Sequence, residues 1–506
     1  MKQHNILQKT VVALLAIMAT VAMQAQDLNS SYFTQDFKYR HQLNPAFGND
    51  QGYCAIPVLG NLDIKLQGNM GMSDFLFENP NWGKPGEKRT VTFMHPSISY
   101  DDAMSGFGDD GLKMLLDMRL TLISLGFKGF GGYNTIEVND RTSLGISLPR
   151  DLLEFAKNVH NDSYSFDDLS LRVQNFAEIA FGHSRDINEK LRVGAKLKVL
   201  LGIGRADLAM DGMSANLTGD TWTLQGKARA DISLKGVQLK MKEDEYKSRY
   251  VTDANGNPKL DANGEKIPQK YQKVDDIDVD GAGLGGFGLG VDLGGVYKLN
   301  DDITLSAAIT DLGFINWSNN VVAETDGTPF QFDGFKDVAI KSDYAGENGT
   351  FKDKGKSYGD QLSDFMNLQD KGDEGGRTTM LSATVSVGAE YTLPMYRKLS
   401  AGLLLQRHFA GENFSWNEGR LSANWTPLRW LNGGVNFGLT SYTASMGWII
   451  NIHPKAVNFF IGMDHVVGKT NKDMIPVNDA NFSFALGMNV AWGGAKKTRR
   501  AADTLD

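Results

Sequence analysis

Strict alternation between apolar residues and small or polar residues is the feature that most limits the fold of this chain. In residues 481–492 (NFSFALGMNVAW) every second residue from Phe482 to Trp492 is apolar, and the residues between them are small or polar. Successive side chains of a β-strand point to opposite faces, so this pattern predicts a strand with one apolar face. The pattern recurs in residues 191–203, 287–293, 303–310, 381–391, 435–440 and 457–464.

Strand length and composition favour a membrane barrel. The alternative is a soluble all-β protein, because the strands of a soluble sandwich also alternate between apolar and polar residues. The strands approach the roughly 9–11 residues that cross a bilayer at a tilt. Their second face is rich in Gly, Ser and Thr, as a crowded lumen requires. We therefore predict an all-β, transmembrane antiparallel barrel of about 14 strands, from 14 to 18 candidate segments. Aromatic residues mark several strand ends, as interfacial girdles do: Tyr297, Trp317, Tyr391, Trp425 and Trp492.

The predicted connections differ in length. Short links such as residues 299–302 alternate with long charged stretches at residues 243–280 and 319–377. Outer-membrane barrels have short periplasmic turns and long external loops, and the strand pattern is the same on both sides of each stretch. We therefore interpret the stretches as loops rather than as linkers between domains. Apolar residues at helical spacing predict short helices at residues 112–116 and at 151–158, the latter with Asp151 as its N-cap.

The start of the chain has the order of a secretory signal peptide. Lys2 and Lys9 precede an apolar run, and small residues lead to Ala25 as the last residue before cleavage. A buried N-terminal helix is the alternative. Cleavage removes two lysines and changes the formal charge from −8 to −10. An acidic chain does not suggest nucleic acid, and the single Cys54 allows no internal disulfide.

Motifs that resemble chemical sites have simpler structural interpretations. Gly281-x-Gly283-x-x-Gly286 matches a dinucleotide fingerprint but leads into a strand rather than a helix, which favours a loop-to-strand junction. Residues 253–266 (DANGNPKLDANGEK) lack the glycine and glutamate spacing of an EF-hand, and we interpret them as two tight turns in an external hairpin, with weak cation binding as the alternative. The sequence has no catalytic or metal-binding motif, so we predict neither an enzyme nor a cofactor.

An N-terminal string, RHQLNPAF at residues 40–47, lies between the signal peptide and the first strand near Tyr53. The order of these parts resembles that of the long-chain fatty-acid transporter (FadL-type) superfamily: a signal peptide, an Asn-Pro-Ala segment and then a barrel. That string and residues 288–317 also resemble an uncharacterised Bacteroidota outer-membrane family of unknown function, over nearly the whole mature chain. The FadL resemblance implies that residues 26–52 form a plug or hatch, carried by Asn44, Pro45 and Ala46.

Together these features predict a signal peptide (1–25), a hatch segment (26–52), a barrel (53–492) and a tail (493–506). Outer-membrane barrels usually end on an aromatic residue, whereas here a basic-then-acidic tail follows Trp492.

We expect a protein of the outer membrane of a diderm bacterium, in contact with lipid and with the barrel assembly machinery. The leading function is passive uptake of a hydrophobic or small organic solute. The alternatives are a non-transporting secretion or assembly partner, or surface anchor, and thirdly a surface enzyme. Three apolar residues in the lumen register are candidates for lining a channel: Leu200, Leu404 and Phe460.

Overall fold

The computed structural model describes residues 28–55, 61–69, 71–157, 162–281, 283–335, 350–411, 413–454, 456–465 and 481–493. The predicted signal peptide and almost all of the predicted tail lie outside these residues. Within them, no helix is both long enough and apolar enough to cross a membrane.

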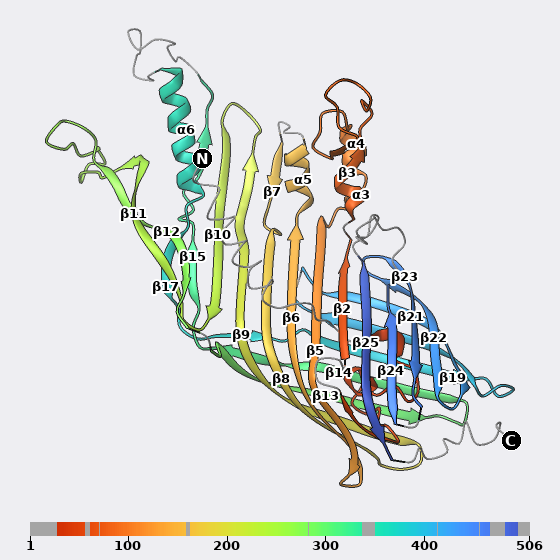
Figure 1. The fold of residues 1–506 in the computed structure, drawn as a ribbon. Coiled ribbons are helices and arrows are strands. Elements are labelled where there is room, and N and C mark those ends of the chain that lie inside the picture. The colour runs from red at the N-terminus through yellow and green to blue at the C-terminus, as the bar shows by residue number, and fades with distance from the viewer. Residues whose placement is uncertain are drawn as a thin grey trace.

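The strands form a closed antiparallel barrel with fourteen strand positions, as predicted (Figure 1). Two short strands, β1 (Gly52–Ala55) and β2 (Asn61–Gly68), share the first position, because both pair with the same two neighbours. Closure comes from pairing of the last strand with this first position, so no edge of the wall is left open. The other thirteen strands follow in chain order: β5 (Leu112–Gly129), β6 (Gly132–Leu148), β8 (Ser170–Asp186), β9 (Leu191–Asn216), β13 (Gly286–Lys298), β14 (Ile303–Trp317), β19 (Ala383–Thr392), β20 (Leu399–Phe409), β21 (Trp416–Leu428), β22 (Leu431–Thr440), β23 (Ala444–Ile452), β24 (Val457–Met463) and β25 (Phe482–Trp492).

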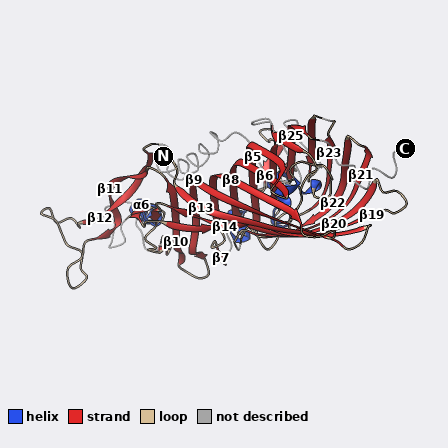
Figure 2. Ribbon diagram, turned by 90° about the horizontal axis from the view of Figure 1, so that it is seen from below, coloured by secondary structure: helices blue, strands red, loops and turns tan. Residues whose placement is uncertain are grey.

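The two ends of the barrel differ, as the sequence predicts. At one end, which we call the short-turn end, neighbouring strands are joined by tight links such as residues 299–302, where the Asn300 side chain accepts a hydrogen bond from the Ile303 amide (2.7 Å). All the long connections lie at the opposite, long-loop end, which is uppermost in Figure 1. Seen from below in Figure 2, β5 and β20 lie on opposite sides of the ring.

Side chains alternate between a bilayer-type outer face and a polar inner face. Val387 is 53% exposed on the outer face of β19, whereas its neighbour Ser386 is 2% exposed on the inner face. Tyr297, Tyr391, Trp425 and Trp492 are also exposed at strand ends. Trp317 contradicts the girdle prediction: it is fully buried, and its indole N–H donates to Thr379 Oγ1 (2.9 Å).

Strand β9 continues beyond the barrel and supports a surface lobe. Its first half pairs with β13 and its second half pairs with β10, so the sheet fans out at the long-loop end (Figure 1). The stretches that were predicted as loops at residues 243–280 and 319–377 therefore contain regular structure. The surface lobe consists of β10 (Trp222–Leu234), β11 (Val237–Tyr250), β12 (Pro268–Val279), β15 (Val321–Glu324), β16 (Phe330–Phe332), β17 (Gln369–Asp373) and α6 (Phe351–Phe365).

The short helices agree only in part with the sequence. Helix α5 (Arg150–Lys157) corresponds to the predicted helix, but Asp151 lies inside its first turn and accepts a hydrogen bond from the Ser165 amide instead of capping it. The other predicted helix is wrong, because residues 112–116 begin strand β5, whose pairing with two neighbours overrides the helical spacing. The remaining elements are α3 (Met72–Phe75), β3 (Leu76–Glu78), β4 (Thr90–Thr92), α4 (Tyr100–Met104), β7 (Ser163–Ser165) and β18 (Arg377–Met380).

The repeated DANG motif and the glycine motif adopt the structures that were predicted for them, two tight turns and a loop-to-strand junction. Each DANG unit is a tight turn at the tip of the β11–β12 hairpin, closed by bridges between Thr252 and Pro258 and between Leu260 and Lys266. The glycine motif ends at Gly286, the first residue of β13. A Cβ atom on Gly286 would lie 3.0 Å from Asn316 O and 3.1 Å from the ring of Trp317, so this glycine permits close packing at a loop-to-strand junction.

Candidate functional site

Residues 28–51, the N-terminal segment, run along the inner wall of the barrel, mainly in the half nearer the short-turn end. Glycines of the wall make room for them. A Cβ atom on Gly194 of β9 would lie 2.2 Å from Pro45 O, and one on Gly294 of β13 would lie 2.0 Å from Asn44 Oδ1. Side chains at these two wall positions would therefore push the segment away from the wall, because non-bonded heavy atoms keep about 3.5 Å apart.

The same relation holds at strands on the other side of the lumen. A Cβ atom on Gly402 would lie 2.4 Å from the ring of Phe33, and one on Gly462 would lie 2.7 Å from Leu28. The inner faces of β9, β13, β20 and β24 are thus shaped to the segment around much of the wall.

The Asn-Pro-Ala turn is held by hydrogen bonds to wall carbonyls. Asn44 donates from Nδ2 to Ala307 O (3.2 Å) and Gly295 O (3.4 Å), and its Oδ1 accepts from the Ala46 amide (2.9 Å). Arg192 of β9 donates from Nε to Ala46 O (2.9 Å). A buried asparagine before proline thus satisfies both its own turn and the wall, which a hydrophobic residue of similar size would not do.

Helix α2 (Arg40–Leu43) binds a buried carboxylate of the wall. Glu137 of β6 accepts from Gln42 Nε2 (2.8 Å) and from Lys196 Nζ (2.8 Å). His41 Nε2 lies 2.8 Å from the hydroxyl of Tyr53, and Lys196 Nζ lies 3.3 Å from His41 Nδ1. Burial lowers the pKa of His41 to about 3, against the attraction of Glu137, so the imidazole is neutral here.

Aromatic side chains provide the apolar contacts of the segment. The ring of Phe37 lies 4.7 Å from the ring of Phe460 in an edge-to-face arrangement, and the ring of Tyr39 lies 5.7 Å from it. Arg40 covers the ring of Phe47 (4.1 Å) and donates to Tyr32 O (2.9 Å). The RHQLNPAF string is therefore a docking sequence, with contacts from Arg40 to Phe47.

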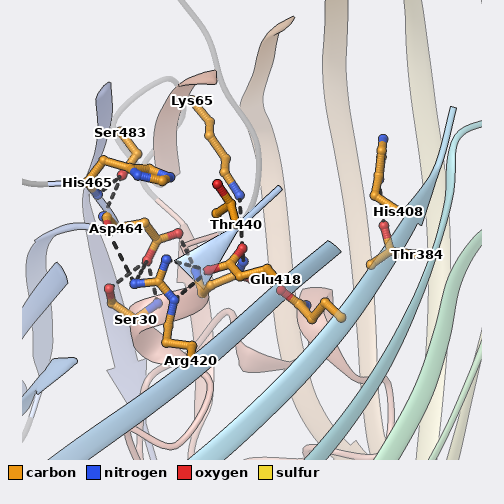
Figure 3. Close-up of polar contacts among 12 residues, drawn as sticks. Ser30, Lys65, Thr384, His408, Glu418, Arg420, Thr440, Asp464, His465 and Ser483 are labelled. Carbon is orange, nitrogen blue, oxygen red and sulfur yellow. Dashed lines mark hydrogen bonds and ion pairs between the residues drawn. The ribbon is translucent and has the colours of Figure 1, made fainter. Parts of the chain in front are cut away.

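The beginning of the segment is tied to the upper ion cluster, which consists of Lys65, Glu418, Arg420 and Asp464 (Figure 3). Asp464 follows β24 and accepts from the backbone amides of Asn29 (2.8 Å) and Ser30 (2.6 Å), at the start of the short helix η1 (Asn29–Ser31). Glu418 accepts from Arg420 Nε (2.6 Å) and lies 3.7 Å from Lys65 Nζ.

A second group of charges, the middle ion cluster, connects β6, β8, β9, β13 and β14. Lys198 Nζ lies 2.8 Å from Asp292 and 2.6 Å from Asp311. Arg141 donates to both carboxylate oxygens of Asp311 (2.6 and 3.1 Å) and to Glu178 (3.0 Å). Asp311 has a φ of 61°, at a bulge where its amide donates to Asp292. This uncommon backbone turns the carboxylate toward the cations.

The three candidate lining residues face inward but are not brought together. Leu404 packs with Tyr32, Phe33 and Leu43, and Phe460 packs with Phe37 and Tyr39, so both contact the N-terminal segment. Leu200 packs with Phe176 and Trp317 against a different part of the wall. They form no continuous apolar lining in this state.

Sequence analysis missed the partners of the charged wall residues. Lys196 and Lys198 fall in the polar register of their strand, which marks them as lumen residues. Their partners Glu137 and Asp311 are 59 and 113 residues away, however, and no spacing rule links them. Among the described residues, no group of three or more His, Cys, Asp or Glu side chains is arranged to hold a metal ion.

Comparison with known proteins gives a family and a set of distant barrels. The toluene transporter TbuX of Ralstonia pickettii is 8% identical, with 92% of this chain and 94% of that chain covered and a TM-score of 0.35. The toluene transporter TodX of Pseudomonas putida is 7% identical, with 93% and 94% covered and a TM-score of 0.34. No curated protein matches. A family model described as "Family of unknown function (DUF5723)" matches residues 45–464.

Proposed function

The chain belongs to the DUF5723 family of unknown function, and we propose that it is a gated channel of a diderm outer membrane for passive uptake of a small organic solute. In this proposal the apolar outer face contacts lipid, and the N-terminal segment is the gate. The surface lobe then faces the cell exterior, because long loops of such barrels lie outside.

One observation carries the proposal: a separate segment, seated on wall glycines, fills the lumen near the short-turn end. A fourteen-stranded barrel is too wide for wall side chains alone to fill. Among the described residues, the segment joins the wall by a single chain connection at β1, and its other contacts are hydrogen bonds, packing and the ion pair of Asp50 with Lys128. Such contacts can be released without breaking a covalent bond, so the same segment can seal and unseal the lumen.

A reversible disulfide tests the gate. A Cβ atom on Gly294 would lie 3.0 Å from Asn44 Cγ, hence within about 4.5 Å of Asn44 Cβ, which suits a disulfide. We expect Asn44→Cys with Gly294→Cys, made in a Cys54→Ser background, to be closed to small solutes when oxidised and open after reduction. The single-cysteine variants, treated in the same way, are the controls.

Deletion of residues 30–49 should leave an inserted barrel that leaks a small dye from liposomes, and unchanged permeability on deletion would rule out the gate.

A second candidate is a non-transporting barrel that binds a protein partner, and the surface lobe favours it. Trp222, Phe335 and Phe351 are 42%, 38% and 56% exposed and are connected through Phe332 in a chain of ring contacts. Exposed aromatic patches are typical of binding surfaces. This candidate predicts stoichiometric co-purification of one partner that is lost in Trp222→Ser with Phe351→Ser, together with no solute passage by the intact chain.

A further inference from the structure

Between the N-terminal segment and the long-loop end, the lumen contains buried polar groups without a partner. Gln67, Gln406 and Trp416 are 0%, 8% and 2% exposed. Both amide atoms of Gln67, the Oε1 atom of Gln406 and the indole N–H of Trp416 have no hydrogen-bond partner among the described residues. Nearly all buried polar groups in native proteins are paired, so three such side chains on one part of the wall indicate that something else supplies the bonds.

Gln406 and Trp416 line a hollow in the upper lumen, and Gln67 lies on β2 outside that lining. Lys65 Nζ lies 4.5 Å from the centre of the Trp416 ring, and Gln67 is two residues further along the same inner face of β2. The imidazole of His408 stacks on the Trp416 ring, with the ring centres 5.2 Å apart, and the indole N–H has no partner among the described residues. The volume of the hollow is about 20 Å³, and its walls include Lys65, Thr310, Thr384, Ser386, Gln406 and Trp416.

The floor of the hollow belongs to the N-terminal segment. Asn29 and Leu43 complete its lining, so the segment separates the hollow from the short-turn end. In this closed state the space between the side chains admits water but nothing larger. Departure of the segment would remove both residues and enlarge the hollow, which couples any site there to the gate.

The lining selects against apolar solutes. An apolar molecule in the hollow would leave Gln406 Oε1 and the indole N–H of Trp416 without hydrogen bonds, which is unfavourable. Charge is close to balanced, because Lys65 faces Glu418 and the carboxylate of Asp311 is bound by Arg141 and Lys198. The unpartnered groups include donors and acceptors. They therefore match a neutral molecule that carries several hydroxyl groups, each of which both donates and accepts.

We propose that the upper lumen, with Gln406 and Trp416, is a binding site for a small neutral polyhydroxylated solute of the polyol or monosaccharide class. This inference rests on the proposed channel function and names its substrate class. It replaces the expectation of a hydrophobic solute with a polar one.

Binding is tested separately from transport, on the full mature chain. Equilibrium binding of radiolabelled sorbitol and D-glucose is measured in detergent micelles, with the gate variant Asn44→Cys/Gly294→Cys in its reduced form. We expect saturable binding that is weakened about two- to tenfold by Gln406→Leu or Trp416→Phe, the effect of losing one buried hydrogen bond. Gln331→Leu, an exposed site on β16 in the surface lobe, is the matched control and should bind normally.

A second measurement keeps the two proposals apart. Uptake of sorbitol, the acidic sugar gluconate and a long-chain fatty acid is compared in proteoliposomes with the gate oxidised and reduced. Preferential entry of sorbitol through the reduced form supports both proposals. Absence of saturable polyol binding, or binding that Gln406→Leu and Trp416→Phe both leave unchanged although they fold, overturns the polyol site even if another solute passes. If polyol binds but no solute passes in either gate state, the proposed channel function is overturned, whereas the proposed polyol site stands.

Discussion

Replacing Gly294 by alanine should loosen the N-terminal segment, whereas the same change at Gly295 should not. The two glycines are neighbours in β13 and face opposite sides of the wall. A Cβ atom on Gly294 would lie 2.0 Å from Asn44 Oδ1 and 3.0 Å from Pro45 Cδ, whereas the nearest atom to a Cβ on Gly295 is Arg192 O at 4.0 Å. The pair therefore adds the same methyl group on the same strand, in contact with the segment at Gly294 and away from it at Gly295.

The expected size of the effect follows from the bonds of Asn44. Its amide has to move by roughly 1.5 Å to reach ordinary contact with the new methyl group. That movement breaks its hydrogen bonds to Ala307 O, Gly295 O and the Ala46 amide. At about 1 kcal/mol for each bond, the docked state loses roughly 2–3 kcal/mol, which lowers the ratio of docked to undocked segment about 30- to 150-fold.

Single-channel recording in planar bilayers measures this ratio as the open probability. Gly294→Ala should open far more often than the unmodified chain, and Gly295→Ala should behave like the unmodified chain. Circular dichroism and heat-modifiable migration of each variant establish that the barrel itself is folded. Equal open probabilities for the two alanine variants, with both folded, would show that contact at Gly294 does not hold the segment.

Three further predictions concern pH, the lipid face and location. Because the docked His41 has a pKa of about 3 against 6.5 when free, docking is fully stable above pH 6.5 and weakens as pH falls. By pH 5 the loss is about 2 kcal/mol, so open probability should rise from pH 7 to pH 5, and His41→Gln should abolish this rise. Val387→Arg should destabilise insertion by roughly 2–4 kcal/mol in lipid unfolding assays, and Ser386→Arg by less; the reverse ranking would show that the two faces are exchanged. Fractionation should recover the chain in the outer membrane, and recovery from the soluble periplasm would contradict a membrane barrel.

The barrel was predictable because its signal is local. A strand places residues two apart on one face, so the exposure of Val387 and the burial of Ser386 follow from a few neighbouring letters. The same reasoning failed at Trp317, since an aromatic residue at a strand end can point either way. Here Gly202 and Gly286 leave room for its ring on the inner side of the wall.

The candidate site was predictable only in outline. The Asn-Pro-Ala string identified the segment through a resemblance, but nothing in its spacing names Gly294 or Glu137 as the surfaces that it contacts. Hydrogen bonds such as Asn44 to Ala307 join residues 263 positions apart, and the ring order that brings them together is a property of the whole sheet. The surface lobe was missed for a related reason, because its short strands β15 and β17 pair with β10 and β12, which are distant in sequence.

The attachment of Ser30 to Asp464 spans 434 residues and has a consequence for assembly. The first residues of the segment bind a carboxylate at the end of β24, and the wall around them closes only when β25 pairs with β1 and β2. Contacts between such distant parts of a chain form late, because the intervening loop must be ordered first. We therefore expect docking of the segment to be the last step of folding. A substitution of Asp464 should delay docking as much as one in the N-terminal residues, and a chain that lacks its last strands should leave the segment undocked.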